Sequence, residues 1–196
     1  MADEVKGISE KTMMIHKDKL YAGYVAKKKE IGEILKEYFD KGDYADANQS
    51  YSYLRGLKEG ETFATNGVYL HEWYFGVLES DGDWQKAPEL SKALIEKWGS
   101  MDKSISYMSA CGMAARGCAV LGWDMKDGRL KQYNSDSHNQ GGVWGCIPII
   151  VLDIYEHAYF IDFGADRKSY IEAYWKAFNW EAAEKMYLKV RDLTFN

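Results

Sequence analysis

Apolar residues recur at helical spacing along much of the chain, and two short apolar runs, 118–123 and 147–152, lie in its second half on either side of the mixed stretch 130–133. Spacing of three to four positions is typical of helices with one buried face, and short charge-free runs are typical of buried strands. We expect helices over residues 10–38, 68–78, 87–98, 101–115, 168–175 and 180–190, a short helical connection over 46–55, and strands over 118–123, 130–133 and 147–152. Helices, then strands, then helices indicate an α+β fold with an all-helical first part.

Local signals mark where several of these elements begin and end. Ser9 is placed to cap the first helix. Asp127-Gly128, between the first two strands, is a typical hairpin turn. The polar stretch 79–83 is the best candidate for a domain boundary, because it separates the most apolar helix from the next amphipathic one.

Composition excludes several classes of protein. The chain has 196 residues, 46% of them hydrophobic, and a formal net charge of −5 with dispersed Lys and Arg, so nucleic-acid binding and disorder are not expected. No apolar stretch approaches the roughly 20 residues of a membrane span. The acidic residues 1–4 have no apolar core and do not resemble a secretory signal. Three cysteines without C-x-x-C spacing indicate free thiols in a reducing cytoplasm rather than a disulfide framework.

Candidate chemistry appears directly after the apolar run 147–152, where Asp153, Glu156 and His157 follow one another. Asp153 and His157 are four residues apart, so both side chains can face one point in a turn or helix. A carboxylate and an imidazole that converge at the end of a buried strand can hold a metal ion. An ordinary Asp–His hydrogen bond at a helix surface is the alternative.

Two further histidines lie in the apolar helical segments. His16 and His71 taken singly are each typical of a buried core residue. Together with Asp153 and His157 they would give three imidazoles and one carboxylate, a set that suits a first-row transition metal with a position left open for water or a small anion. The spacing H-E-x-x-H is absent, so a metalloprotease is not indicated.

Four separated motifs then resemble one family in the right order. Residues 153–160, DIYEHAYF, closely resemble the D-x-W-E-H-A-Y-Y signature of iron/manganese superoxide dismutases, and the pieces at 166–167, 170–173 and 179–181 continue the match. Residues 15–25 resemble the family's H-x-x-K-H-H-x-x-Y-V helix. His71 with the aromatic residues 73–75 resembles its second helix. The resemblance covers nearly the whole chain.

The resemblance implies a helical-hairpin domain over residues 1–82 and an α/β domain with a three-stranded antiparallel sheet over 83–196. It implies an enzyme that disproportionates superoxide to dioxygen and hydrogen peroxide at one metal ion per chain. The implied ligands are His16, His71, Asp153 and His157. Iron is expected over manganese, because in this family Gly at the position of Val151 tends to accompany manganese and bulkier residues accompany iron.

The resemblance also assigns supporting roles. Tyr24 matches a tyrosine that lines the substrate channel, and Arg167 matches an arginine near its mouth. Glu156 matches a glutamate that reaches a ligand histidine of the partner, so a homodimer or larger assembly is implied. The family usually has a Gln beside the metal, and the loop before the third strand offers two candidates for that position. Alignment back from the strand favours His138, with Gln140 as the alternative.

The chain departs from the family pattern in the residues around the metal. Tyr155 and Phe75 stand where tryptophans are common, Cys118 aligns with another tryptophan, and Leu20 and Phe160 replace a His–Tyr pair that normally spans the dimer. These changes leave open a metal-binding relative of the family with weak or no activity. A non-haem iron oxygenase is the other alternative, but it uses two His and one carboxylate, and the third His argues against it.

Overall fold

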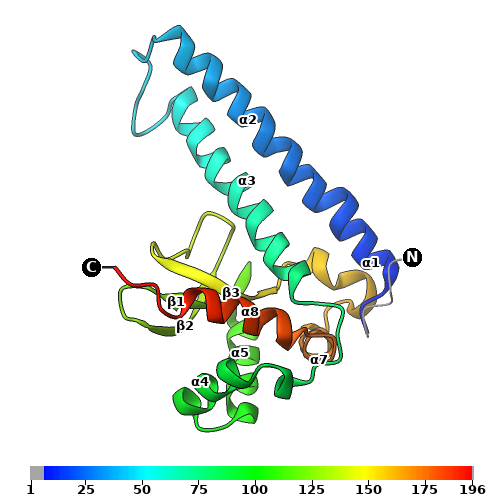
Figure 1. The fold of residues 1–196 in the computed structure, drawn as a ribbon. Coiled ribbons are helices and arrows are strands. Elements are labelled where there is room, and N and C mark those ends of the chain that lie inside the picture. Colours follow the sequence, from blue (N-terminus) through cyan, green and yellow to red (C-terminus); the bar gives the residue numbers. More distant parts are fainter. Residues whose placement is uncertain (1–6, 196) are drawn as a thin grey trace.

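The computed structural model describes residues 7–195, so the acidic residues 1–4 lie outside the described part. Two long antiparallel helices project from an α/β body (Figure 1). The first is continuous but has three parts, α1 (Glu10–Ile15), a π-helical turn η1 (His16–Tyr21) and α2 (Ala22–Lys41). Ser9 begins it as predicted, because its hydroxyl accepts the Thr12 N–H at 3.2 Å.

The second long helix differs from the sequence expectation. α3 runs over Tyr53–Gly76, whereas we expected a helix only over 68–78 and a short helical connection over 46–55. Glycines at 56, 60 and 67 lower helix propensity and interrupt the apolar pattern. Close packing against α2 compensates for the low helix propensity. A Cβ on Gly60 would lie only 3.1 Å from Ile31 of α2, so a larger residue would crowd this contact. Two of the glycines that obscure the helix in the sequence, Gly60 and Gly67, therefore allow its close approach to α2.

The α/β body confirms the expected sheet. Strands β1 (Cys118–Asp124), β2 (Arg129–Ser135) and β3 (Cys146–Asp153) form an antiparallel sheet in the order β2-β1-β3. Gly128 has a φ of 60° in the turn between β1 and β2, which explains its place there. The helices of this part are α4 (Pro88–Trp98), α5 (Met101–Ala114), α6 (Phe160–Phe163), α7 (Arg167–Lys176) and α8 (Trp180–Val190), with single 3₁₀ turns η2 (Trp84–Lys86) and η3 (Glu156–Ala158).

The hydrophobic core continues from the hairpin into the α/β body. Tyr74 of α3 is fully buried beside Tyr170 and Tyr174 of α7, and the Tyr170 and Tyr74 hydroxyls lie 3.1 Å apart. Tyr170 donates to the carbonyl of Asp153 at 2.8 Å and Tyr174 to that of Val151 at 2.9 Å. These bonds hold the end of β3 against α7, and the Tyr170–Tyr74 contact joins α7 to α3. We still propose a domain division after residue 82, because the polar stretch 79–83 separates α3 from the helices that follow.

The start of α4 depends on a distant carboxylate. Its N-cap residue, Ala87, has no capping side chain, and the buried Glu184 of α8 accepts the N–H groups of Glu89 at 3.1 Å and Leu90 at 2.8 Å. We expect Glu184→Ala to lower the free energy of unfolding by about 2 kcal/mol, since two N–H donors at the helix start, one buried and one partly buried, lose a charged acceptor. Urea denaturation measures this. Glu181→Ala, an exposed change on the same helix, is the matched control, and equal losses in both variants would contradict the capping role.

Candidate metal centre

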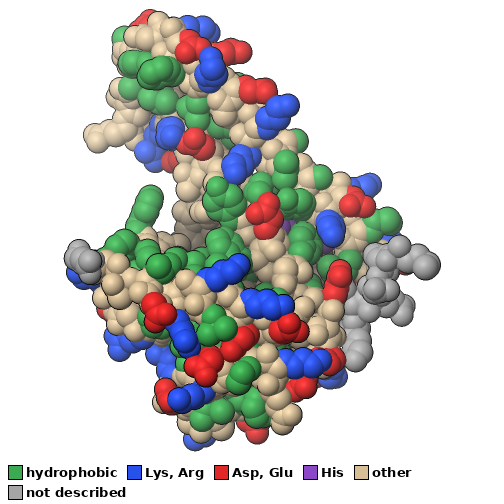
Figure 2. All heavy atoms as spheres, viewed as in Figure 1, with side chains coloured by type: hydrophobic (Ala, Val, Ile, Leu, Met, Phe, Trp, Pro, Cys, Tyr) green, Lys and Arg blue, Asp and Glu red, His purple; other side chains and the backbone are tan. Residues whose placement is uncertain are grey.

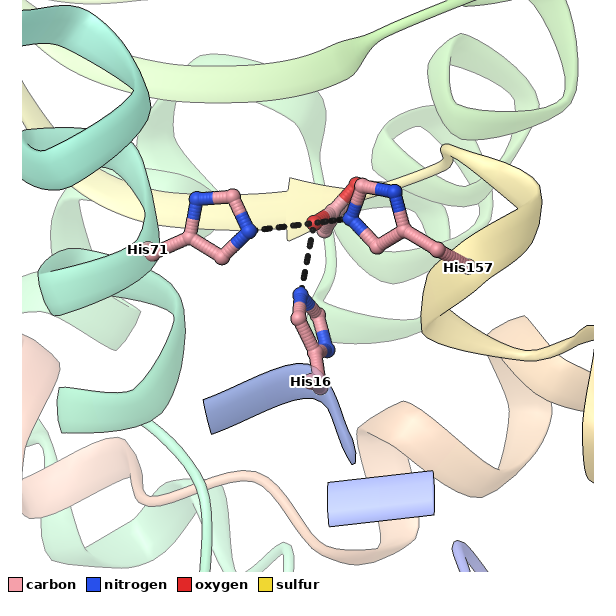
Figure 3. Close-up of side chains that lie close together, drawn as sticks. His16, His71 and His157 are labelled. Carbon is pink, nitrogen blue, oxygen red and sulfur yellow. Dashed lines mark hydrogen bonds and ion pairs between the residues drawn. The ribbon is translucent and has the colours of Figure 1, made fainter. Parts of the chain in front are cut away.

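Four side chains from distant parts of the sequence converge where the hairpin meets the sheet. His16 comes from the start of η1, His71 from α3, Asp153 from the end of β3 and His157 from η3. One donor atom from each lies within 4.8 Å of all the others. Figure 3 shows the three imidazoles pointing toward the same carboxylate. His16, His71 and Asp153 are buried, and in the view of Figure 2 almost no histidine surface is visible.

The π-helical turn changes which face the first helix presents to this cluster. In a straight α-helix, His16 and Tyr24 would be rotated about 80° apart. The i→i+5 bonding of η1 accommodates one extra residue and brings the two positions to within about 20° of each other. Both rings consequently contact His71, at centroid distances of 4.9 Å and 5.2 Å. The sequence pattern did not predict this turn.

Asp153 is held so that one oxygen faces the imidazoles. Its Oδ1 accepts the Tyr155 N–H at 3.0 Å. Its Oδ2 lies 3.2 Å from His157 Nε2, 3.3 Å from His16 Nε2 and 3.8 Å from His71 Nε2. Burial alone raises the pKa of Asp153, but hydrogen bonding and the charges of His157 and His16 outweigh it, so the pKa lies well below its usual range. The group is therefore a carboxylate at neutral pH.

His71 is held in the form that binds metals. Its Nδ1 lies 2.6 Å from the carbonyl oxygen of Gly67, which can only accept, so Nδ1 carries the proton and Nε2 presents a lone pair. Burial lowers the pKa of His71 to about 4, so the ring is neutral. A backbone acceptor on the far nitrogen is also what orients metal-binding histidines in general.

Buried nitrogens without hydrogen bonds indicate whether a metal ion fits the four side chains of the cluster. The Nε2 atoms of His16 and His71 are buried and make no hydrogen bond among the described residues, although Asp153 Oδ2 lies 3.3 Å and 3.8 Å from them. Buried polar atoms without partners are costly and rare. A metal ion bonded at about 2.1 Å leaves its ligand atoms about 3 to 4 Å apart, close to the separations measured from Asp153 Oδ2. Three nitrogens and one carboxylate oxygen fit a first-row transition metal.

The other predicted site residues differ in their positions. The Tyr24 ring lies 4.9 Å from the His138 ring, and burial raises the pKa of the Tyr24 hydroxyl. His138 is buried, and its ring stacks parallel to His71 at 5.6 Å. Gln140 is exposed. The structure therefore places Tyr24 and His138 beside the cluster and Gln140 at the surface, and the role of His138 beside the metal stays a prediction.

Comparison with known proteins identifies the family. Residues 85–186, just over half of the chain, match the model of the iron/manganese superoxide dismutase C-terminal domain. The chain is 41% identical over 185 residues to a protein of Aquifex pyrophilus named superoxide dismutase [Fe], covering 94% of this chain and 86% of that protein. The chain belongs to the iron/manganese superoxide dismutase family.

Other members of the superoxide dismutase family are similar over the same length. The iron protein of Aquifex aeolicus is 40% identical over 185 residues, again 94% of this chain and 86% of the relative. The manganese protein of Haloarcula marismortui is 30% identical over 182 residues, 93% of this chain and 86% of the relative. The resemblance drawn from the four motifs is thus confirmed, and relatives of both metal types share it.

Three of the residues that depart from the superoxide dismutase pattern lie around the cluster. Phe75 lies edge-on to His16 at 5.0 Å. Tyr155 stacks between His138 at 5.0 Å and His157 at 5.3 Å. Cys118 is paired with Asp153 in the register of β1 and β3, and burial raises the pKa of its thiol well above the ordinary value. The wall of the site remains aromatic despite the substitutions.

Arg167 hydrogen-bonds to two backbone carbonyls and one tyrosine, and its place near a channel mouth stays a prediction. Its guanidinium donates to the carbonyls of Ala115 at 2.9 Å and Met113 at 3.3 Å, at the end of α5. A further contact joins its Nε to the Tyr159 hydroxyl at 3.3 Å. These bonds tie α5 to α7, so Arg167 has a structural position in this chain.

Proposed function

We propose that this protein disproportionates superoxide to dioxygen and hydrogen peroxide at one iron ion per chain. The proposed ligands are His16, His71, Asp153 and His157. The convergence of their four donor atoms within 4.8 Å, in a member of this family, is the observation that supports the proposal. Neither alternative is favoured by a specific observation, and an oxygenase would not use the third imidazole.

The residues explain how the chain would support this reaction. Iron, when bound, would supply a one-electron couple that takes an electron from one superoxide and returns it to a second. The Asp153 carboxylate provides negative charge that balances the ion, and neutral His71 presents Nε2 to it. The second superoxide needs two protons to become hydrogen peroxide. Both ring nitrogens of His138 lack a partner in the described chain, so one of them can hold a proton beside the site.

Iron is proposed over manganese because of Val151. This fully buried residue stands two positions before Asp153, and its carbonyl accepts the Tyr174 hydroxyl at 2.9 Å. Groups behind the ligands tune a metal's potential and typically change activity 10–100-fold. We expect the iron-loaded protein to consume superoxide at least about tenfold faster than the manganese-loaded protein at equal occupancy. Pulse radiolysis of both forms measures this.

The comparison of the iron-loaded and manganese-loaded protein distinguishes an error in the metal preference from an error in the proposed function. Faster turnover with manganese would overturn the preference for iron and leave the dismutase function intact. Full occupancy by either metal with no superoxide consumption would contradict the proposed function and favour the alternative of a metal-binding relative without activity.

A homodimer that joins two metal centres is a further part of the proposal. Glu156 is exposed next to the partly exposed His157, and the apolar Phe160 and Ile161 nearby are 55% and 47% exposed. We propose that Glu156 pairs with the partner's His157 while the apolar residues pack across the interface. Light scattering should give the mass of a dimer or larger, and Glu156→Ala should shift it toward a monomer. Glu172→Ala, also exposed, is the control, and a stable active wild-type monomer would refute the pairing.

We propose a cytoplasmic location on the basis of the cysteines. Cys111, Cys118 and Cys146 are all free, which suits a reducing cytoplasm. Within residues 7–195, none of the helices combines the length and apolarity needed to traverse a bilayer. The substrate proposed is superoxide, and a nucleic-acid partner is not proposed.

A further inference from the structure

The loop that carries His138 is tied to the helical hairpin by one side chain. The Asn66 amide of α3 donates from Nδ2 to the carbonyl of His138 at 2.6 Å. Among residues 7–195, this is the single hydrogen bond found between the hairpin and loop 136–145. The loop's other backbone bonds are internal or lead to the α/β body, such as Gln140 N–H to Ser137 at 3.1 Å.

Asn66 lies on the part of α3 that builds the metal centre. Phe63, Asn66, Gly67 and His71 follow at helical spacing, so they share one side of α3. The carbonyl of Gly67 orients His71, and a Cβ on Gly67 would lie 2.7 Å from the Tyr24 ring. One rigid helical segment therefore places a proposed ligand and also anchors the loop opposite it.

The His138 ring has no polar contact of its own that would fix it. Both ring nitrogens are buried without a partner among the described residues. The ring is instead enclosed by aromatic rings at 4.9 to 5.6 Å, those of Tyr24, Phe63, His71 and Tyr155. Beside it, a groove of about 420 Å³ lies between α3 and the loop, with Asn66 and His138 in its lining. The groove gives the loop space to move away from α3 if the amide bond is lost.

We infer that Asn66 is a positioning residue that holds His138 against the metal centre through the backbone of loop 136–145. The amide fixes the carbonyl of His138, and the aromatic contacts then fix its ring next to His71. The role of the ring in turnover rests on the proposed function, whereas the tie between α3 and the loop does not.

Hydrogen exchange on the metal-free protein tests the tie by itself. In Asn66→Ala, the Asp136 and Gln140 amides, which close the loop internally, should exchange about five- to tenfold faster, as expected for the loss of one hydrogen bond. The matched control is Asn139→Ala, which removes an exposed contact with Ser137 in the same loop and leaves the tie to α3 intact. Unchanged loop exchange in Asn66→Ala, or an equal increase in the control, would overturn the inference.

A double-mutant cycle tests whether Asn66 acts through His138. The metal's midpoint potential and kcat/KM are measured for iron-loaded wild type, Asn66→Ala, His138→Ala and the double variant. Asn66→Ala should shift the potential and lower kcat/KM about fivefold, and both effects should vanish in the His138→Ala background. Effects of the same size in both backgrounds would overturn the inference. A wild-type protein without dismutase activity would contradict the proposed function, and the exchange and potential measurements would still decide the role of Asn66.

Discussion

Replacing His71 with Ala should remove the metal and the dismutase activity together. The variant leaves two imidazoles and a carboxylate around a centre built for four donors, and it deletes the ring that Gly67 orients. Mutating a residue that only hydrogen-bonds to a metal ligand typically lowers metal affinity or activity 10–100-fold. Removing a ligand itself should therefore lower activity by more than about a hundredfold. Metal content by elemental analysis and superoxide consumption measure the result.

Two controls separate loss of the ligand from loss of the fold. Tyr69→Ala changes an exposed residue on the same helix and should retain metal and activity. The thermal unfolding of His71→Ala should be compared with that of metal-free wild type, because bound metal stabilises the folded state by mass action. Full occupancy and full activity in His71→Ala would show that His71 is not a ligand.

The variant His138→Ala should retain the metal yet lose about 10- to 100-fold in activity and shift the metal's midpoint potential. The His138 ring is buried and stacks on His71 at 5.6 Å, so its removal changes the space beside the ion without removing a donor. Gln140→Ala should change neither quantity, because that side chain is exposed. Metal content, activity and potential are measured for both variants.

Substitution by an amide distinguishes a polar role of His138 from simple packing. His138→Gln retains an N–H that can donate beside the metal, so it should recover part of the activity that His138→Ala loses. If Gln140→Ala shifts the potential while His138→Ala leaves potential and activity unchanged, the assignment to His138 is wrong.

The sequence by itself determined the elements that depend on local chemistry. The charge-free run 147–152 became β3, the Asp127-Gly128 pair became the turn between β1 and β2, and Ser9 became the cap of the first helix. These features arise within a few residues, where side-chain size, branching and hydrogen bonding act directly on the backbone. The four motifs were also sufficient to predict the family, because each keeps its residue spacing within a short segment of the chain.

Tertiary structure alone decided the features that depend on contacts between distant segments. The start of α3 at Tyr53 depends on its packing against α2, which the glycines permit and local propensity opposes. Asn66 was not recognised in the sequence, because its role requires a loop some seventy residues away to return to α3. Alignment in the sequence favours His138 over Gln140, but the surroundings of the two side chains depend on tertiary structure. They are two residues apart in one polar loop, and His138 packs among aromatic rings from α2, α3 and the segment after β3 while Gln140 is exposed.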